Sequence, residues 1–90
     1  MKLRQLIYLL AIADNGLNIT AAANKLYTSQ PGVSKQLKLL EEELGVAIFE
    51  RNGRNLSGTT MAGQQIIVRA RRIVRELEVI RALPKDFSGE

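Results

Sequence analysis

The side chains that could carry chemistry in this chain are amides, hydroxyls and cations, because cysteine and histidine are both absent. Their absence excludes disulfides, a thiol nucleophile, and thiolate or imidazole ligands for a metal. Ser34 and Lys35 place a nucleophile next to a base, but neighbouring residues on a helix point away from each other. We therefore expect neither an enzyme nor a bound metal or cofactor.

The balance of charge favours a polyanionic partner. The net charge is +4 over 90 residues and the pI is near 9.9, which favours nucleic acid over a membrane surface.

Long apolar runs are absent, so we expect no membrane span. The N-terminal segment MKLRQLIYLLAIADNG has a basic start, but it lacks a small-residue cleavage site and its apolar residues are helically spaced. We therefore expect one small cytoplasmic domain.

The clearest binding pattern lies in residues 30–44. On a helix with about 100° per residue, the apolar residues share one narrow arc: Val33, Leu37, Leu40 and Leu44. Small, hydroxyl and basic side chains lie opposite, in the N-terminal half: Pro31, Ser34, Lys35 and Lys38. The acids at positions 41–43 lie at the other end, which suits a helix whose N-terminal half enters a major groove. The alternative is an amphipathic surface helix with a solvated polar face.

Two shorter helices precede this one and position it. Residues 3–14 have helical periodicity that Asn15-Gly16 ends, and Asn18 is a candidate N-cap for a helix over residues 19–26. A very short turn follows, in which Thr28 or Ser29 caps the helix over residues 30–44, and Gly45 ends it. Two helices joined by such a turn predict a helix-turn-helix whose second helix reads DNA.

A β-hairpin is predicted after the third helix. Residues 46–49 and 55–60 are two short runs on either side of Asn52-Gly53, which is a hairpin signal. Arg51 and Arg54 flank its tip, where a wing could reach a phosphate or the minor groove. Taken singly, each arginine is better explained by a solvated hairpin. Together with the preceding helices, they favour contact with DNA.

A long helix is predicted over residues 61–83, stopped by Pro84 and followed by a loose polar tail. Its apolar residues alternate spacings of four and three, as in a coiled-coil seam: Ile66, Ala70, Ile73, Leu77 and Ile80. We expect this seam to meet a partner helix, and the alternative is packing on its own domain. The expected organisation is a DNA-binding domain over residues 1–60, a dimerisation linker helix over 61–83, and the start of a tail over 84–90.

Residues 21–63 resemble the DNA-binding domain of LysR-type transcriptional regulators, and the similarity extends from Met1 to the end of the long helix. The matching elements occur in the family's order: Ala22-Ala23, Leu26, Ser29-Gln30-Pro31, Ser34, Leu40-Glu41, Glu43-Leu44-Gly45, Phe49-Glu50-Arg51 and Thr60-Met61-Ala62-Gly63. Residues 27–36, following Asn18, are most similar to the CysB/Cbl subgroup, which regulates sulfur assimilation. The resemblance implies a mainly α, winged helix-turn-helix fold and sequence-specific binding of double-stranded DNA.

The resemblance also implies roles for individual residues. Positions directed at the major groove are matched by Gln30, Pro31, Ser34 and Lys35. We add Lys38 to them, because it lies on the same polar face of the helix over residues 30–44. Arg54 matches the wing residue in the minor groove, and contacts to the DNA backbone are assigned to Thr20, Thr28, Ser29 and Arg51. Many family members have arginine at the position of Lys35, and lysine cannot form the planar two-pronged contact to guanine. Residues 55–58 also depart from the usual apolar pattern of the wing.

The resemblance further implies a homodimer whose linker helices pair antiparallel, bound to operator half-sites related by a twofold axis. It leaves a tetramer open for the full-length protein. Family members carry a larger C-terminal domain that binds an inducer, so we expect this sequence to be an isolated DNA-binding fragment. The alternative function is a small helical dimerisation or adaptor module without DNA binding. That module would explain the seam on the long helix but not the Ser-Gln-Pro sequence, the wing arginines or the placement of the acids.

Overall fold

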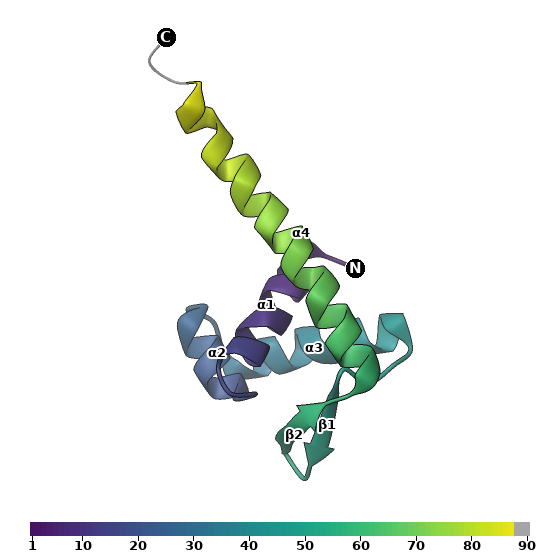
Figure 1. Ribbon diagram of the computed structural model, residues 1–90. Helices are drawn as coiled ribbons and strands as arrows, with labels where there is room; N and C mark the ends of the chain where they lie inside the picture. The colour runs from purple at the N-terminus through teal and green to yellow at the C-terminus, as the bar shows by residue number, and fades with distance from the viewer. Residues whose placement is uncertain (88–90) are drawn as a thin grey trace.

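The computed structural model describes residues 1–87, which form four helices and one antiparallel hairpin (Figure 1). The elements are α1 (Leu3–Asp14), α2 (Ile19–Lys25), α3 (Gln30–Leu44), β1 (Phe49–Asn52), β2 (Asn55–Thr59) and α4 (Met61–Asp86). The first three helices pack together, the hairpin projects below the start of α4, and α4 passes α1 and extends beyond the other helices (Figure 1). The predicted winged three-helix fold with a long C-terminal helix is confirmed.

The core is aliphatic apart from one phenylalanine. Its buried members come from all four helices and from the start of the hairpin: Leu6, Leu9, Leu10, Ile12, Ala22, Ala23, Val33, Leu37, Leu40, Ile48, Phe49 and Ala70. The small side chains of Ala22 and Ala23 let α2 lie close against its neighbours. Helix α3 packs on this core through Val33, Leu37 and Leu40, which leaves its opposite side exposed.

The caps of the helix-turn-helix pair are those that the sequence predicts. Asn18 Oδ1 accepts a hydrogen bond from the Ala21 N–H at 2.9 Å, and Ser29 Oγ accepts from the Gly32 N–H at 3.1 Å. Gly45 ends α3 with a φ of 72°, a left-handed conformation that glycine adopts without steric cost. Side-chain caps of this kind stabilise a helix by about 1 kcal/mol each, so both helices have defined starts.

The hairpin begins three residues later than predicted. Residues 46–48 are not a strand, because the Ile48 N–H donates to the carboxylate of Glu41 instead of to a strand partner. The apolar character of this run reflects the burial of Ile48 in the core. β1 and β2 then pair antiparallel, with a bulge between Glu50 and Arg51. The pairing of residues 55–59 shows that the unusual wing sequence still forms a strand.

The Thr-x-x-Gly sequence at the start of α4 ties this helix to the hairpin. The Thr60 hydroxyl oxygen accepts from the Gly63 N–H at 2.9 Å and donates to the Ala47 carbonyl at 2.6 Å. Gly63 is buried against the backbone of Ile48, so a methyl group at this position would overlap the Ile48 carbonyl. The first turn of α4 is therefore fixed both by a cap and by a close backbone approach.

The end of α4 differs from the prediction. We expected Pro84 to stop the helix, but the helix continues to Asp86 with Pro84 inside its last turn. Proline removes one helical hydrogen bond, and because residues 81–87 are exposed, water can satisfy the carbonyl that loses its donor. Residues 84–86 of the predicted tail are thus helical, and residues 88–90 lie outside the described residues.

The N-terminal half of α4 packs on the chain's own core. Ala70 is 1% exposed and belongs to the core, and Ile66, Ile67 and Val74 are partly buried against it. We predicted Ala70 as part of an intermolecular seam, and this placement is wrong because α1 and its neighbours already cover the side chain. The first half of the predicted seam therefore joins α4 to its own domain.

A bidentate ion pair also joins α4 to α1. Arg71 Nη1 donates to Asp14 Oδ2 at 3.0 Å, and Arg71 Nη2 donates to Asp14 Oδ1. These hydrogen bonds lower the pKa of the Asp14 carboxyl and raise the pKa of the Arg71 guanidinium, against a smaller opposing effect of burial. Both side chains are about half exposed, so the pair contributes at most about 1 kcal/mol of stability. Its geometry nevertheless helps to fix the direction of α4.

Within residues 1–87, no single helix is long and apolar enough to cross a membrane. The helices α1 and α2 reach that length and composition only as a pair, bent by 119° at the break between them. The same residues contain no group of three or more potential metal-ligating side chains.

Candidate nucleic-acid interface

A polar groove brings together residues from three elements that the sequence assigns to DNA contact. Thr20 comes from α2, Gln30 is the first residue of α3, and Arg54 comes from the tip of the hairpin. The groove has a volume of about 390 Å³. Its remaining lining comes from the loop after α1, the first residue of α2 and the hairpin: Gly16, Leu17, Asn18, Ile19, Asn55 and Leu56. The helix-turn-helix and the wing therefore share one surface.

A second, open groove of about 660 Å³ lies between α3 and the base of the hairpin. Ser34 and Lys38 on α3 and Arg51 on β1 all line it. Pro31 and Lys35 line neither groove and are exposed on the first two turns of α3. The exposed side of α3 is thus continuous from its N-terminus to the hairpin.

The cations on this surface differ in whether they are already paired. Within residues 1–87, Lys35, Lys38 and Arg54 form no ion pair or side-chain hydrogen bond. Arg51 instead donates from Nη2 to the Glu41 carboxylate at 3.1 Å. Unpaired, solvated cations on one face attract an extended polyanion, because each can neutralise a phosphate.

The start of α3 also offers neutral donors. Its first turn contains no acid, so the positive end of the helix dipole is not compensated within that turn. Ser29 accepts the capping bond through its oxygen, which leaves its hydroxyl hydrogen available to donate to a phosphate. Thr28 is half-buried beside it. These groups suit contacts to a DNA backbone that crosses the N-terminus of α3.

Three residues of this region have roles that the sequence did not predict. Asn18 was assigned a capping role alone and Asn55 was given no role, yet both line the groove with Gln30 and Arg54. Glu41 was treated as a distant acid, although it contacts the hairpin. Only the Leu-Glu element of the family pattern marked Glu41, and no local periodicity could reveal a contact made across a loop.

The fold and this surface define a winged helix-turn-helix domain. Residues 3–64 match the family model described as bacterial regulatory helix-turn-helix protein, lysR family. The match covers well over half of the chain, and this chain belongs to the LysR family.

The chain is similar to regulators of the subgroup that the sequence indicates. It is 49% identical over 88 residues to the HTH-type transcriptional regulator CysB of Haemophilus influenzae, covering 98% of this chain and 27% of that protein. It is 40% identical over 90 residues to the HTH-type transcriptional regulator cbl of Escherichia coli strain K12, covering 100% of this chain and 28% of that protein. The chain therefore spans little more than a quarter of these relatives.

The fold is also close to that of a domain solved with DNA. The crystal structure of BenM_DBD in complex with benA site 1 DNA superposes with a TM-score of 0.85 at 34% identity, covering all of both chains. The CbnR_DBD–DNA complex superposes with a TM-score of 0.81 at 38% identity, again over the full length of both chains. Both likenesses extend through the hairpin and the long helix.

Proposed function

We propose that this chain binds double-stranded DNA sequence-specifically, as the DNA-binding part of a LysR-type transcription regulator. The observation that carries the proposal is the shared groove, in which Thr20, Gln30 and Arg54 meet from α2, α3 and the wing. A catalytic role is not part of the proposal, and the site of action is the cytoplasm, where the DNA lies.

Within this proposal, α3 enters the major groove and the wing follows the neighbouring minor groove. The residues assigned to the major groove are Gln30, Pro31, Ser34, Lys35 and Lys38. Arg54 reaches the minor groove, and the backbone contacts come from Thr20, Thr28, Ser29 and Arg51. The exposure of the α3 side chains and the unpaired state of Lys35, Lys38 and Arg54 support these assignments.

The genes that the proposal points to are those of sulfur and cysteine metabolism. The similarity to CysB and cbl regulators over the whole of this chain supports that choice. The operator would contain two half-sites related by a twofold axis, bound by a homodimer. The helix from Met61 onward would act as the linker that sets the spacing between the two domains.

Footprinting on promoters of sulfur-metabolism genes, combined with a salt titration, tests the proposal. We expect protection that a scrambled competitor does not remove. The logarithm of the affinity should fall against the logarithm of salt concentration by about 0.9 for each phosphate contacted. Affinity that does not change between low and physiological salt would favour the adaptor module over DNA binding.

A further inference from the structure

Three consecutive acids lie near the C-terminal end of α3, and the structure gives each a different environment. Glu43 pairs with the N-terminal amine of Met1 at 2.8 Å, and both groups are nearly half exposed. Glu42 is exposed and has no ion pair or side-chain hydrogen bond within the described residues. The Glu41 side chain is only 14% exposed. Glu41 is therefore the acid that the fold has enclosed.

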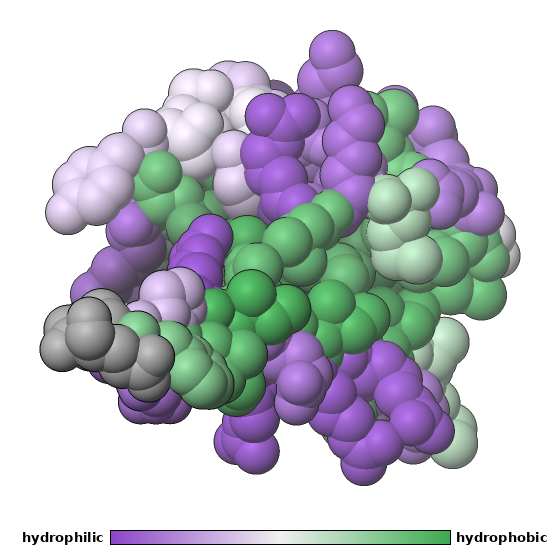
Figure 2. All heavy atoms as spheres, turned by 90° about the horizontal axis from the view of Figure 1, so that it is seen from above, coloured by the Kyte–Doolittle hydropathy of each residue, from purple (hydrophilic) through white to green (hydrophobic). Residues whose placement is uncertain are grey.

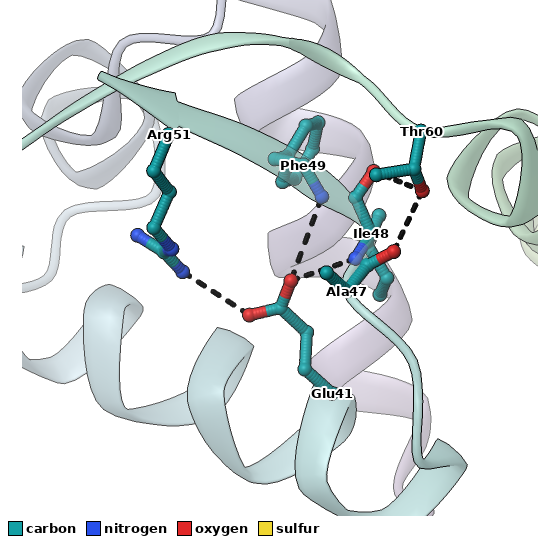
Figure 3. Close-up of polar contacts among 6 residues, drawn as sticks. All are labelled: Glu41, Ala47, Ile48, Phe49, Arg51 and Thr60. Atoms are coloured by element: carbon teal, nitrogen blue, oxygen red, sulfur yellow. Dashed lines mark hydrogen bonds and ion pairs between the residues drawn. The ribbon is translucent and has the colours of Figure 1, made fainter.

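The two oxygens of Glu41 serve different parts of the hairpin (Figure 3). Oε2 accepts from the backbone N–H of Ile48 at 2.7 Å and from that of Phe49 at 3.5 Å. Oε1 accepts from Arg51 Nη2 at 3.1 Å. One carboxylate thus connects the last turns of α3 both to the backbone entering β1 and to a side chain on β1.

These bonds lie at the base of the hairpin, beside those that the Thr60 hydroxyl makes with the Ala47 and Ile48 carbonyls. Ile48 and Phe49 are buried, whereas residues 50–55 are all exposed. The direction of the exposed tip, which carries Arg54, therefore depends on how the base is held against α3.

We propose that Glu41 is a positioning residue that fixes the wing relative to the recognition helix, so that Arg54 and Gln30 face the same groove. Glu41 itself does not contact DNA. The inference deepens the proposed function and rests on it for its effect on DNA binding. Its effect on the free protein does not depend on DNA.

For a variant that removes the charge of Glu41, simple electrostatics and the positioning role predict opposite effects on DNA affinity. Removing a negative charge near DNA should strengthen binding, because phosphates repel carboxylates. If Glu41 positions the wing, its loss should instead weaken binding. Glu42→Gln is the matched control, because it removes the same charge at the neighbouring residue, and Glu42 forms no ion pair or side-chain hydrogen bond with the hairpin.

Glu41→Gln is the informative variant, since it keeps the shape of the side chain. A carboxylate has two acceptor oxygens, whereas an amide has one acceptor oxygen and a donor NH2 group. Glutamine therefore cannot accept from both Ile48 and Arg51. On a duplex selected from a random-sequence pool by the wild-type chain, we expect Glu41→Gln to weaken binding by about fivefold. Glu42→Gln should leave the affinity unchanged or raise it, and an equal gain for both variants would overturn the proposal.

The double variant with Arg54→Ala separates this proposal from the proposed function. In the wild-type background, we expect Arg54→Ala to weaken binding by about tenfold. In the Glu41→Gln background, the same change should cost less than about threefold, because the wing is already misdirected. If Arg54→Ala weakens binding by the same factor in both backgrounds, the positioning role is overturned. No effect in either background contradicts the wing contact in the proposed function.

Residual dipolar couplings of the free protein test the positioning role without DNA. The amide couplings of residues 49–58 and of α3 should fit one alignment tensor in the wild type and in Glu42→Gln. In Glu41→Gln, we expect the helices still to fit a common tensor while the hairpin no longer does. A hairpin that keeps its orientation in Glu41→Gln would overturn the proposal whatever the DNA measurements give.

Discussion

At the scale of single residues, the proposed reading of DNA depends on what each side chain can distinguish. Gln30 carries both a donor and an acceptor, the combination that recognises the adenine edge in a major groove. Lys35 is a point charge on a flexible stem, so it attracts phosphate or guanine without a fixed two-pronged geometry. Both are exposed on the first two turns of α3. We therefore assign more of the sequence preference to Gln30 than to Lys35.

Replacing Gln30 with alanine should reduce specificity more than overall affinity. We expect a loss of about 1–3 kcal/mol on the selected duplex and little change on random DNA, measured by fluorescence anisotropy. Lys35→Ala is the comparison, because the loss of a cation should weaken binding to both DNAs and reduce the salt slope. If Gln30→Ala weakens both equally, the reading face of α3 lies elsewhere.

The sequence predicted the types of residues in the site better than their mutual contacts. The exposed positions of Lys35 and Lys38 follow from helical periodicity alone. The pairing of Arg51 with Glu41 does not, because it joins residues ten positions apart through a loop of irregular conformation. Such a contact depends on where the loop ends, and the sequence placed the start of β1 three residues too early.

At the scale of elements, local signals predicted the starts of the helices well. Asn18 and Ser29 are caps whose effect is confined to one turn, so neighbouring residues are enough to recognise them. The prediction failed at Pro84, where the helix tolerates a proline near its exposed end. It also failed at Ala70, because periodicity identifies an apolar stripe but not the surface that covers it.

Gly63 gives a direct test of how α4 is attached to the hairpin. In Gly63→Ala, the added methyl group would overlap the backbone carbonyl of Ile48, and backbone cannot move aside as a flexible side chain can. Overpacking of this kind costs about 1–3 kcal/mol of stability. Thermal unfolding followed by circular dichroism should show a fall in Tm of roughly 4–8 °C per kcal/mol for a chain of this size.

Gly58→Ala provides the matched control for that substitution. An added Cβ at Gly58 would lie 3.5 Å from Glu50 Oε2, which is an ordinary contact with the end of a flexible side chain. We expect its stability to stay within about 0.5 kcal/mol of the wild type. Equal effects at Gly58 and Gly63 would mean that the close approach between Gly63 and Ile48 is not important for stability.

At the scale of the whole molecule, α4 has two differently covered halves. Its N-terminal half packs on the core through Ala70, whereas Ile73 is 49% exposed and Ile80 is 61% exposed. An apolar groove of about 250 Å³ lies beside this transition: Met1, Leu6, Leu44, Gln65, Ile66, Arg69, Ala70 and Ile73 line it. Seen from above, apolar side chains form a band across the middle of the face, with polar side chains on either side (Figure 2).

This arrangement reduces the set of α4 residues that could form the seam of the proposed dimer. The residues still available to a partner helix are those on the exposed part of the stripe, Ile73, Leu77 and Ile80, and not Ala70. The chain measures 56 × 25 × 20 Å because α4 extends past the other helices. A second copy pairing along this projecting half would cover apolar side chains that no other described element covers.

Replacing both Ile73 and Leu77 with aspartate should therefore abolish the dimer without unfolding the domain. Burying two unpaired carboxylates at a helix–helix contact costs several kcal/mol, whereas neither side chain is part of the core. We expect a monomer by analytical ultracentrifugation, with near-native helicity by circular dichroism. The variant should lose most of its affinity for a two-half-site operator while retaining weak binding to a single half-site.

The same helix supplies a control that separates loss of the seam from the effect of added charge. Val68 and Val79 are 45% and 46% exposed, close to the 49% of Ile73, but lie on the opposite side of α4 at about 100° per residue. Aspartate at both positions adds the same two charges to the same helix, so any general repulsion from DNA is matched. We expect this variant to remain dimeric. If both double variants are dimeric, the interface lies away from α4, and if both are monomeric, charge on the helix rather than burial at the seam controls assembly.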